Sequence, residues 1–191
     1  MNILQPLLDI SNLTGGYSNK NVLHDISFSI QSGEIVGLIG LNGAGKSTTI
    51  KHIIGLLAEK SGQITINGKT LKENSTSYRK EIGYIPEQPI LYDELTLYEH
   101  LRLTAMAHDL DEETFEARLP ALLEAFRMER QLHWFPVHFS KGMRQKVMIM
   151  CAFLIEPSLY IVDEPFVGLD PLGIQYYIDW MEKMKNNGAG L

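Results

Sequence analysis

A loop at residues 40–48 carries the residue types that bind polyphosphate. It reads Gly-Leu-Asn-Gly-Ala-Gly-Lys-Ser-Thr, which fits the pattern G-x-x-x-x-G-K-[ST], and it lies between an apolar run and a helical stretch. Glycines let the backbone wrap with its N–H groups turned inward, and the positive end of the following helix faces the enclosed space. Lys46 would reach the β- and γ-phosphates, while the Ser47 hydroxyl would ligate Mg²⁺. The predicted nucleotide contacts are Asn42, Gly43, Ala44, Gly45, Lys46, Ser47 and Thr48.

Two adjacent carboxylates follow the apolar run 159–162. Asp163 and Glu164 come where a buried strand would end, at the sheet edge where open parallel sheets bind their ligands. Asp163 would hold Mg²⁺ directly or through water, and Glu164 would act as a general base toward an attacking water. Gln88, between two prolines, could touch both metal and water, although its setting alone favours a plain polar loop residue.

Two further segments have both a binding interpretation and a plain structural one. The hydroxyl of Ser140, the flexible Gly142 and the start of a helix would together form a second anion site, but the spacing alone favours an ordinary capped helix. Tyr17, in a glycine-rich turn, could stack on a purine ring or pack on its own hairpin. The sequence leaves both alternatives open.

The strands that must position these residues are predicted from hydrophobic periodicity. Alternation of apolar and polar residues predicts an antiparallel hairpin from 7–14 and 22–30, and the continuous apolar run 34–39 predicts a strand buried on both faces of a parallel sheet. Shorter strands are predicted at 62–68, 82–85 and 159–162. The chain is therefore expected to have a mixed sheet.

From residue 90 to about 157 the apolar residues follow helical spacing, and this stretch is predicted to be entirely helical. Pro120 is expected to kink or split the second of these helices. In a last helix, over 171–187, the residues predicted to face inward are Ile174, Ile178 and Met181. Capping residues mark where the helices begin: Thr96 with Glu99, then Asp111, Ser140 and Asp170.

Composition narrows the classes of partner and compartment. The 191 residues carry a formal net charge of −6 and no basic stripe of the kind that follows a nucleic-acid backbone, so no direct nucleic-acid partner is expected. The apolar run 147–155 is too short to span a bilayer, and no N-terminal signal is present. A soluble, intracellular protein is predicted, with Cys151 in the core and no metal-ligand spacing among its six histidines.

Taken in order along the chain, these motifs resemble those of the nucleotide-binding subunit of an ABC transporter. They are Tyr17, the loop 40–48, Gln88, the segment Ser140-Lys141-Gly142-Met143, the run 159–164 and Gly168-Leu169-Asp170. The resemblance covers essentially the whole chain. The segment 139–143, the family's signature segment, departs from the common Leu-Ser-Gly-Gly-Gln at Phe139, Lys141 and Met143. Its sequence is similar to that of the Ecs-type exporter ATPases.

This resemblance implies a role for each motif. Tyr17 would stack on adenine, and Gln88 would sense the metal and the attacking water. Ser140, Gly142 and Met143 would contact ATP held by a second copy, with Ser140 and Gly142 on its γ-phosphate. Two ATP-binding subunits would thus form a head-to-tail dimer around two ATP, and the segment 168–170 would contact the partner at the seam.

The resemblance also implies an α/β fold, the P-loop NTPase fold of ABC type. A single domain over 1–191 would have a mixed-sheet core with an N-terminal antiparallel β layer, 1–88 and 158–191, and an inserted all-helical subdomain, 89–157. ATP binding and hydrolysis would drive a membrane permease from the cytoplasmic face of the cell membrane. The permease would dock in a groove between the Gln88 loop and the helical subdomain, where the apolar candidates are Leu91, Tyr92, Leu95 and Leu97.

Two other classes share the phosphate loop. A soluble ABC-type ATPase acting on nucleic acid or ribosomes typically carries a coiled-coil insertion or a second cassette, and this sequence has neither. A small-molecule kinase would leave the segment 140–143 and the acid pair unexplained. The family also places a switch histidine on the strand after the helix 171–187, and the sequence ends before it. The C-terminal part of the core is therefore expected to be missing, and the 191 residues are expected to bind MgATP but to hydrolyse it poorly.

Overall fold

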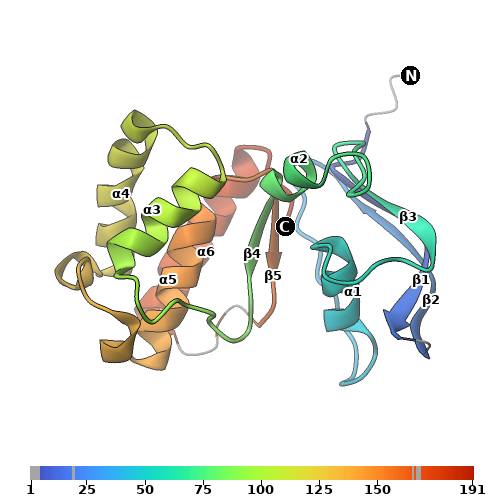
Figure 1. The fold of residues 1–191 in the computed structure, drawn as a ribbon, viewed down its shortest axis with the longest axis horizontal. Helices are drawn as coiled ribbons and strands as arrows, with labels where there is room; N and C mark the ends of the chain where they lie inside the picture. Colours follow the sequence, from blue (N-terminus) through green and yellow to red (C-terminus); the bar gives the residue numbers. More distant parts are fainter. Residues whose placement is uncertain (1–4, 19, 165, 167–168) are drawn as a thin grey trace. The chain divides into compact units, whose positions relative to one another are not determined.

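The computed structural model describes residues 5–18, 20–164, 166 and 169–191, and Figure 1 shows their elements. The chain divides into two compact units, and each is described by itself. The first comprises residues 1–82, 158–161 and 184–191, and the second comprises 83–157 and 162–183. The predicted boundaries of the core and the helical subdomain remain a prediction.

An antiparallel sheet forms one layer of the first unit. Its strands are β1 (Leu8–Tyr17), β2 (Lys20–Ile30) and β3 (Ser61–Ile66), with β1 in the middle. Leu8 lies opposite both Ile30 of β2 and Ile66 of β3, and all three side chains are buried. The predicted hairpin and the predicted strand at 62–68 are therefore confirmed.

The predicted buried strand at 34–39 is wrong. This run is extended but forms no strand, and the side chain of Ile39 is 95% exposed. Only its beginning is paired: Leu191 donates its N–H to the carbonyl of Glu34 at 2.9 Å, and Val36 donates to the carbonyl of Leu191 at 2.8 Å. Within the described residues, the backbone at 37–39 has no such partner. A strand needs a neighbour to satisfy its backbone, so apolar residues alone do not make one.

Two helices complete the first unit. Helix α1 (Lys46–Ile53) begins at the phosphate loop, as predicted. Helix α2 (Ser75–Lys80) was not predicted, because the stretch around it is polar, but Asn74 caps it by accepting a hydrogen bond from the N–H of Ser77 at 2.9 Å. Buried Tyr78 of α2 donates its hydroxyl hydrogen to the carbonyl of Ile53 at 2.8 Å. The end of α1 is therefore held by α2.

A pair of strands runs from the first unit into the second. They are β4 (Ile82–Ile85) and β5 (Leu159–Val162), both at predicted positions. Leu159 donates its N–H to the carbonyl of Glu81 and Asp163 donates to that of Ile85, each at 2.9 Å, so the residue numbers rise together and the strands are parallel. The acid pair therefore follows the end of β5, beside the end of β4.

Four helices dominate the second unit. They are α3 (Leu97–Ala107), α4 (Glu112–Phe126), α5 (Lys141–Leu154) and α6 (Pro171–Asn186), joined in part by short 3₁₀ turns at Glu129–Gln131 and Pro136–His138. Helices α3 and α4 both pack on α5 (Figure 1). The predicted caps are confirmed, and those of the first three of these helices are the Thr96–Glu99 capping box, Asp111 and Ser140.

Two details of these helices correct the predictions, and a third narrows one. Pro120 does not split α4, which continues to Phe126, so of the two expected effects the kink stays a prediction; Pro120 lies on the exposed side. Ile178 does not face inward: it is 38% exposed, because the aromatic rings of Tyr177 and Trp180 pack on Phe153 instead, with centroid distances of 5.7 and 5.3 Å. Leu97 is fully buried in α3 and is not an exposed docking residue.

The hydroxyl of Tyr78 gives a first testable prediction. In Tyr78→Phe the carbonyl of Ile53 loses its buried donor, so the free energy of unfolding should fall by about 1 kcal/mol, measured by urea denaturation. Tyr92→Phe makes the same chemical change at an exposed side chain and should alter it by less than about 0.5 kcal/mol. Equal losses in the two variants would contradict the role of this hydrogen bond.

The only cysteine gives a second prediction. Part of Cys151 is accessible, but burial around its thiol raises the pKa to about 11, against the lowering effect of a hydrogen bond with Thr104. A raised pKa means less thiolate, so iodoacetamide at pH 8 should modify the folded chain about a hundredfold more slowly than the urea-unfolded chain, followed by mass spectrometry. The rate on the folded chain should rise about tenfold per pH unit until pH 11. Equal rates for folded and unfolded chain at pH 8 would show that Cys151 is a reactive thiol.

Candidate nucleotide site

The phosphate loop enters α1 through a backbone conformation that requires glycine. Gly45 has φ 97°, in the left-handed region, and a Cβ at this position would lie 2.8 Å from Cδ2 of Leu23 in β2. Gly43 also has a positive φ, 84°, but open space around it. The glycine at 45 therefore permits both the turn into the helix and the close packing of the loop on the sheet.

The start of α1 offers hydrogen-bond donors to an anion. No side chain caps this helix, so its first backbone N–H groups are left for a ligand. Lys46 folds back over the loop, where its Nζ donates to the carbonyls of Gly40 and Leu41 at 2.8 and 3.2 Å. Ser47, the next residue, is exposed. Uncapped N–H groups, an ammonium and a hydroxyl are the donor set that fits a polyphosphate and its metal ion.

Tyr17 lies next to α1 in the same unit. The Nζ of Lys51 donates to its hydroxyl at 2.9 Å and lies 5.3 Å from the ring centroid. This hydrogen bond from Lys51, with a further one from Thr48, lowers the pKa of Tyr17. The ring is 45% exposed, so part of it is open to a stacking partner. The structure thus brings Tyr17 to the helix that begins at the phosphate loop, and adenine stacking remains a prediction.

The acid pair and the Gln88 loop lie together in the second unit. The N–H of Asp163 bonds the carbonyl of Ile85, and Gln88 follows three residues later. Burial raises the pKa of Tyr84 on β4, and the negative charges of Asp163 and Glu87 raise it further. Glu164 is exposed and has φ 56°, an uncommon conformation for a residue with a side chain. The end of β5 therefore brings a carboxylate to the start of the Gln88 loop.

Ser140 is the capping residue of α5. Its Oγ accepts a hydrogen bond from the N–H of Met143 at 3.2 Å, which is the capped-helix interpretation of this segment. Ser140 and Lys141 are exposed, and Gly142 is half-buried. The hydroxyl that caps the helix keeps its own proton, so capping leaves it able to donate to an anion.

One residue of this region was missed in the sequence. Gln145 is buried in α5 and its Nε2 donates to the carbonyl of Pro86, two residues before Gln88. Its position was visible as a polar residue at the four-residue spacing of the buried apolar face, ahead of Ile149 and Phe153. That spacing marks burial and leaves the partner unidentified.

The predicted contact residues are divided between the two units. Tyr17 and the loop 40–48 belong to the first, and the rest, Gln88, Ser140, Gly142, Met143, Asp163 and Glu164, belong to the second. Gly168 lies outside the described residues. Within the segment that follows it, Asp170 accepts a hydrogen bond from the N–H of Gly173 at 2.6 Å and so begins α6, as predicted.

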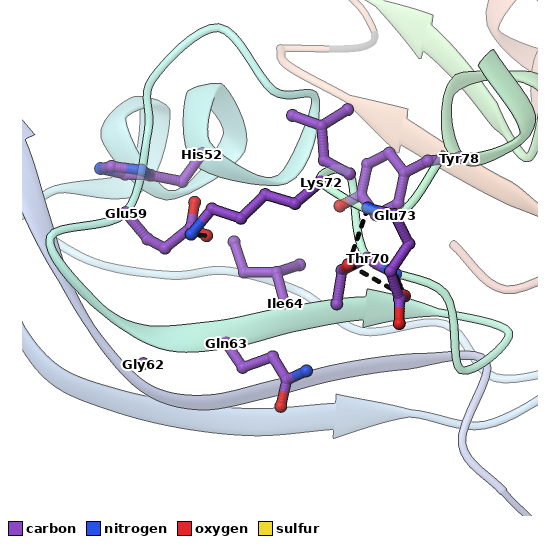
Figure 2. A pocket seen from close by; sticks show the side chains of 10 residues that line it. His52, Glu59, Gly62, Gln63, Ile64, Thr70, Lys72, Glu73 and Tyr78 are labelled. Carbon is purple, nitrogen blue, oxygen red and sulfur yellow. Dashed lines mark hydrogen bonds and ion pairs between the residues drawn. The ribbon is translucent and has the colours of Figure 1, made fainter. Parts of the chain in front are cut away.

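A pocket of about 330 Å³ lies in the first unit (Figure 2). His52 of α1, Ile64 of β3 and Tyr78 of α2 line it, and Lys72 reaches across to Glu59, with Nζ and Oε1 2.6 Å apart. None of the predicted nucleotide contacts is among its described lining residues. The charges of Lys72 and Glu59 therefore neutralise one another inside the pocket.

The described residues contain neither a metal-ligand cluster nor a membrane-spanning helix. They contain no cluster of three or more His, Cys, Asp or Glu side chains that could hold a metal ion. Among the same residues, no helix has both the length and the apolar content needed to cross a bilayer.

Comparison with known proteins gives a consistent result. The family model described as ABC transporter matches residues 23–167. The chain is 60% identical over 185 residues to the ABC-type transporter ATP-binding protein EcsA of Bacillus subtilis (strain 168), covering 97% of this chain and 75% of EcsA. A solved ATP binding subunit of an ABC transporter has a TM-score of 0.94 and 60% identity, over 96% of this chain and 76% of that one. For cbiO1 from Clostridium perfringens, part of the ABC transporter complex cbiONQ, the values are 0.77 and 26%, over 95% and 74%.

These matches confirm the predicted fold class and the similarity to the Ecs-type exporter ATPases. They are transporter subunits, and so they do not favour a soluble ATPase acting on nucleic acid or ribosomes. ATP binding and ATPase activity are general properties of these proteins. From the matched family, and from the agreement of sequence and fold with its members, we conclude that the chain belongs to the ABC transporter family and is an ATP-binding subunit.

Proposed function

We propose that the chain binds MgATP on its phosphate loop and hydrolyses it in a head-to-tail dimer that drives a membrane permease. The observation that carries this proposal is the start of α1, where no side chain caps the helix, Lys46 folds over the loop and Ser47 is exposed. Because Lys46 Nζ already bonds carbonyls of its own loop, phosphate oxygens would take over donors that are preorganised there. Tyr17 would hold the adenine beside Lys51.

Mg²⁺ would be held by oxygen atoms of Ser47, Gln88 and Asp163. A hydroxyl, an amide and a carboxylate are hard ligands that suit this ion, with phosphate oxygens and water completing its shell. The ion would neutralise charge that builds up on the phosphates during hydrolysis. Glu164 and Gln88 would orient the attacking water, with Glu164 accepting its proton. Slow hydrolysis by these 191 residues stays a prediction.

The second copy would complete the site through Ser140, Gly142 and Met143. The positive end of α5 and the free proton of the Ser140 hydroxyl would face the γ-phosphate, and Lys141 would add a positive charge at the seam. The γ-phosphate of each ATP would lie between the N-terminus of α1 in one copy and that of α5 in the other. It would join the two copies only while it is present. Dimer formation would therefore follow ATP binding.

The partner in the membrane is proposed from the relatives. EcsA is an ATP-binding protein of a transporter, and cbiO1 is part of a transporter complex. The permease would dock near the Gln88 loop, where Ile90 and Tyr92 expose apolar surface while Leu91 and Leu95 are half-buried. The subunit would then lie on the cytoplasmic face of the membrane.

Replacing the general base tests the dimer and the hydrolysis together. Glu164→Gln should lower the kcat for ATP hydrolysis by about a hundredfold or more and should trap an ATP-bound dimer. Light scattering after size exclusion in MgATP, together with phosphate release, measures both. Lys46→Ala in the same background should remain a monomer, because it lacks the lysine that binds the phosphates. Normal turnover by Glu164→Gln would refute the assignment of Glu164 as the base.

Replacing exposed apolar residues tests the docking surface. The double variant Ile90→Ser, Tyr92→Ser should lose co-purification with the permease and keep its affinity for ATP, because these side chains lie outside the nucleotide contacts. The control is Leu103→Ser, Met106→Ser, another exposed apolar pair, on α3, that should leave co-purification unchanged. If the first variant co-purifies like the native protein, the permease docks elsewhere.

A further inference from the structure

We propose that Gln145 is a positioning residue for the Gln88 loop, through which α5 controls the placement of Gln88 at the metal ion. The inference rests on the proposed function, because it takes Gln88 to be a metal contact. Gln145 itself touches neither nucleotide nor metal in this proposal. It would act on hydrolysis only through the loop.

The contact is a buried one. The side chain of Gln145 is 1% exposed, and its Nε2 donates to the carbonyl of Pro86 at 3.2 Å. In the part of the chain that the structure describes, its Oε1 is buried with no hydrogen-bond partner. A buried amide with an unmatched oxygen costs stability, so an apolar side chain would serve a purely structural purpose better. This cost points to a role for the amide at Pro86.

The carbonyl of Ile85, one residue before Pro86, is bonded by a different element. The carbonyl of Ile85 accepts the N–H of Asp163 at 2.9 Å, and that of Pro86 accepts the Gln145 amide. Two consecutive carbonyls at the base of the loop are therefore attached to two elements, the end of β5 and the first turns of α5. One residue, Glu87, separates Pro86 from Gln88, and Pro89 restricts the backbone conformation of Gln88, which precedes it. A displacement of α5 would be passed to Gln88 over two residues.

The same helix carries the contact to the second copy. Ser140 begins α5, and Gln145 lies little more than one turn further along it. Arg144, its neighbour, also approaches the loop region, but its ion pair with Asp93 spans 3.8 Å and that carboxylate is 72% exposed, so solvent screens it. The buried link between the signature end of α5 and the Gln88 loop is thus Gln145.

The test compares the same substitution at a buried glutamine, Gln145, and at a half-buried one, Gln131. Gln145→Met keeps the length of the side chain and removes the donor, and Gln131→Met makes this change in the 3₁₀ turn after α4, where Oε1 is likewise buried without a partner among the described residues. Gln145→Leu also lacks the donor and serves where the Met variant fails to fold. Each is measured in the full-length protein assembled with its permease, for kcat, for the Mg²⁺ concentration that half-saturates hydrolysis, and for the Kd of ATP.

Loss of an outer residue that orients a metal ligand typically costs tenfold or more in metal affinity or activity. We expect the Gln145 variants to raise the half-saturating Mg²⁺ concentration and to lower kcat by about tenfold each, with the Kd of ATP within about twofold of the native value. Gln131→Met should leave all three unchanged. Because Gln145 acts through Gln88, the double variant Gln145→Met, Gln88→Ala should be no slower than Gln88→Ala alone.

Each other outcome overturns a stated claim. Native Mg²⁺ dependence and kcat in the Gln145 variants, with Gln88→Ala impaired, would overturn this inference and leave the proposed function intact. Losses that multiply in the double variant would show that Gln145 acts independently of Gln88, and would also overturn it. Native activity of Gln88→Ala would overturn the metal role of Gln88, and with it both proposals.

Discussion

The backbone conformation at Gly45 is the constraint on which the nucleotide site depends. Its left-handed φ turns the chain directly into α1, and Leu23 leaves no room for a Cβ there. Because the turn is made by backbone alone, no side chain needs to cap the helix, and the first N–H groups stay available. The same close approach fixes α1 against the sheet, which brings Lys51 to Tyr17. One glycine thus links the anion site to the position of the aromatic ring.

The features predicted correctly from the sequence are those with local causes. The caps at Thr96, Asp111 and Ser140 depend on side chains within three residues of the helix start, and alternation in β1 and β2 depends on neighbours along the strand. The prediction of a strand at 34–39 is wrong for the opposite reason. A buried strand depends on partners distant in sequence, and within the part of the chain that the structure describes only residues 34–36 have one. Ile178 failed likewise, because the aromatic rings around Phe153 decided which face of α6 is buried.

The predictions for the site divide in the same way, between local causes and partners distant in sequence. The loop at 40–48 and the acid pair can be predicted as site residues from sequence, since the chemistry of each is contained in adjacent residues. The link between Asp163 and Ile85 needed only the pairing of two predicted strands, and so it could be anticipated from parallel topology. Gln145 could not, because its partner is a backbone carbonyl on another element, and a carbonyl has no sequence signature. Contacts to main-chain atoms are therefore the part of a site that sequence motifs leave out.

Ser140 shows how an apparent choice between structure and binding is resolved by hydrogen-bond chemistry. A hydroxyl has two acceptor lone pairs and one proton, and accepting the N–H of Met143 uses only a lone pair. The cap fixes the oxygen at the helix terminus, and its proton is then free to point outward, along with the unpaired N–H groups of the first turn. Capping therefore preorganises the donor that an anion needs. At α1 no side chain caps the helix and its first N–H groups stay free, so the two helix starts keep hydrogen-bond donors available in different ways.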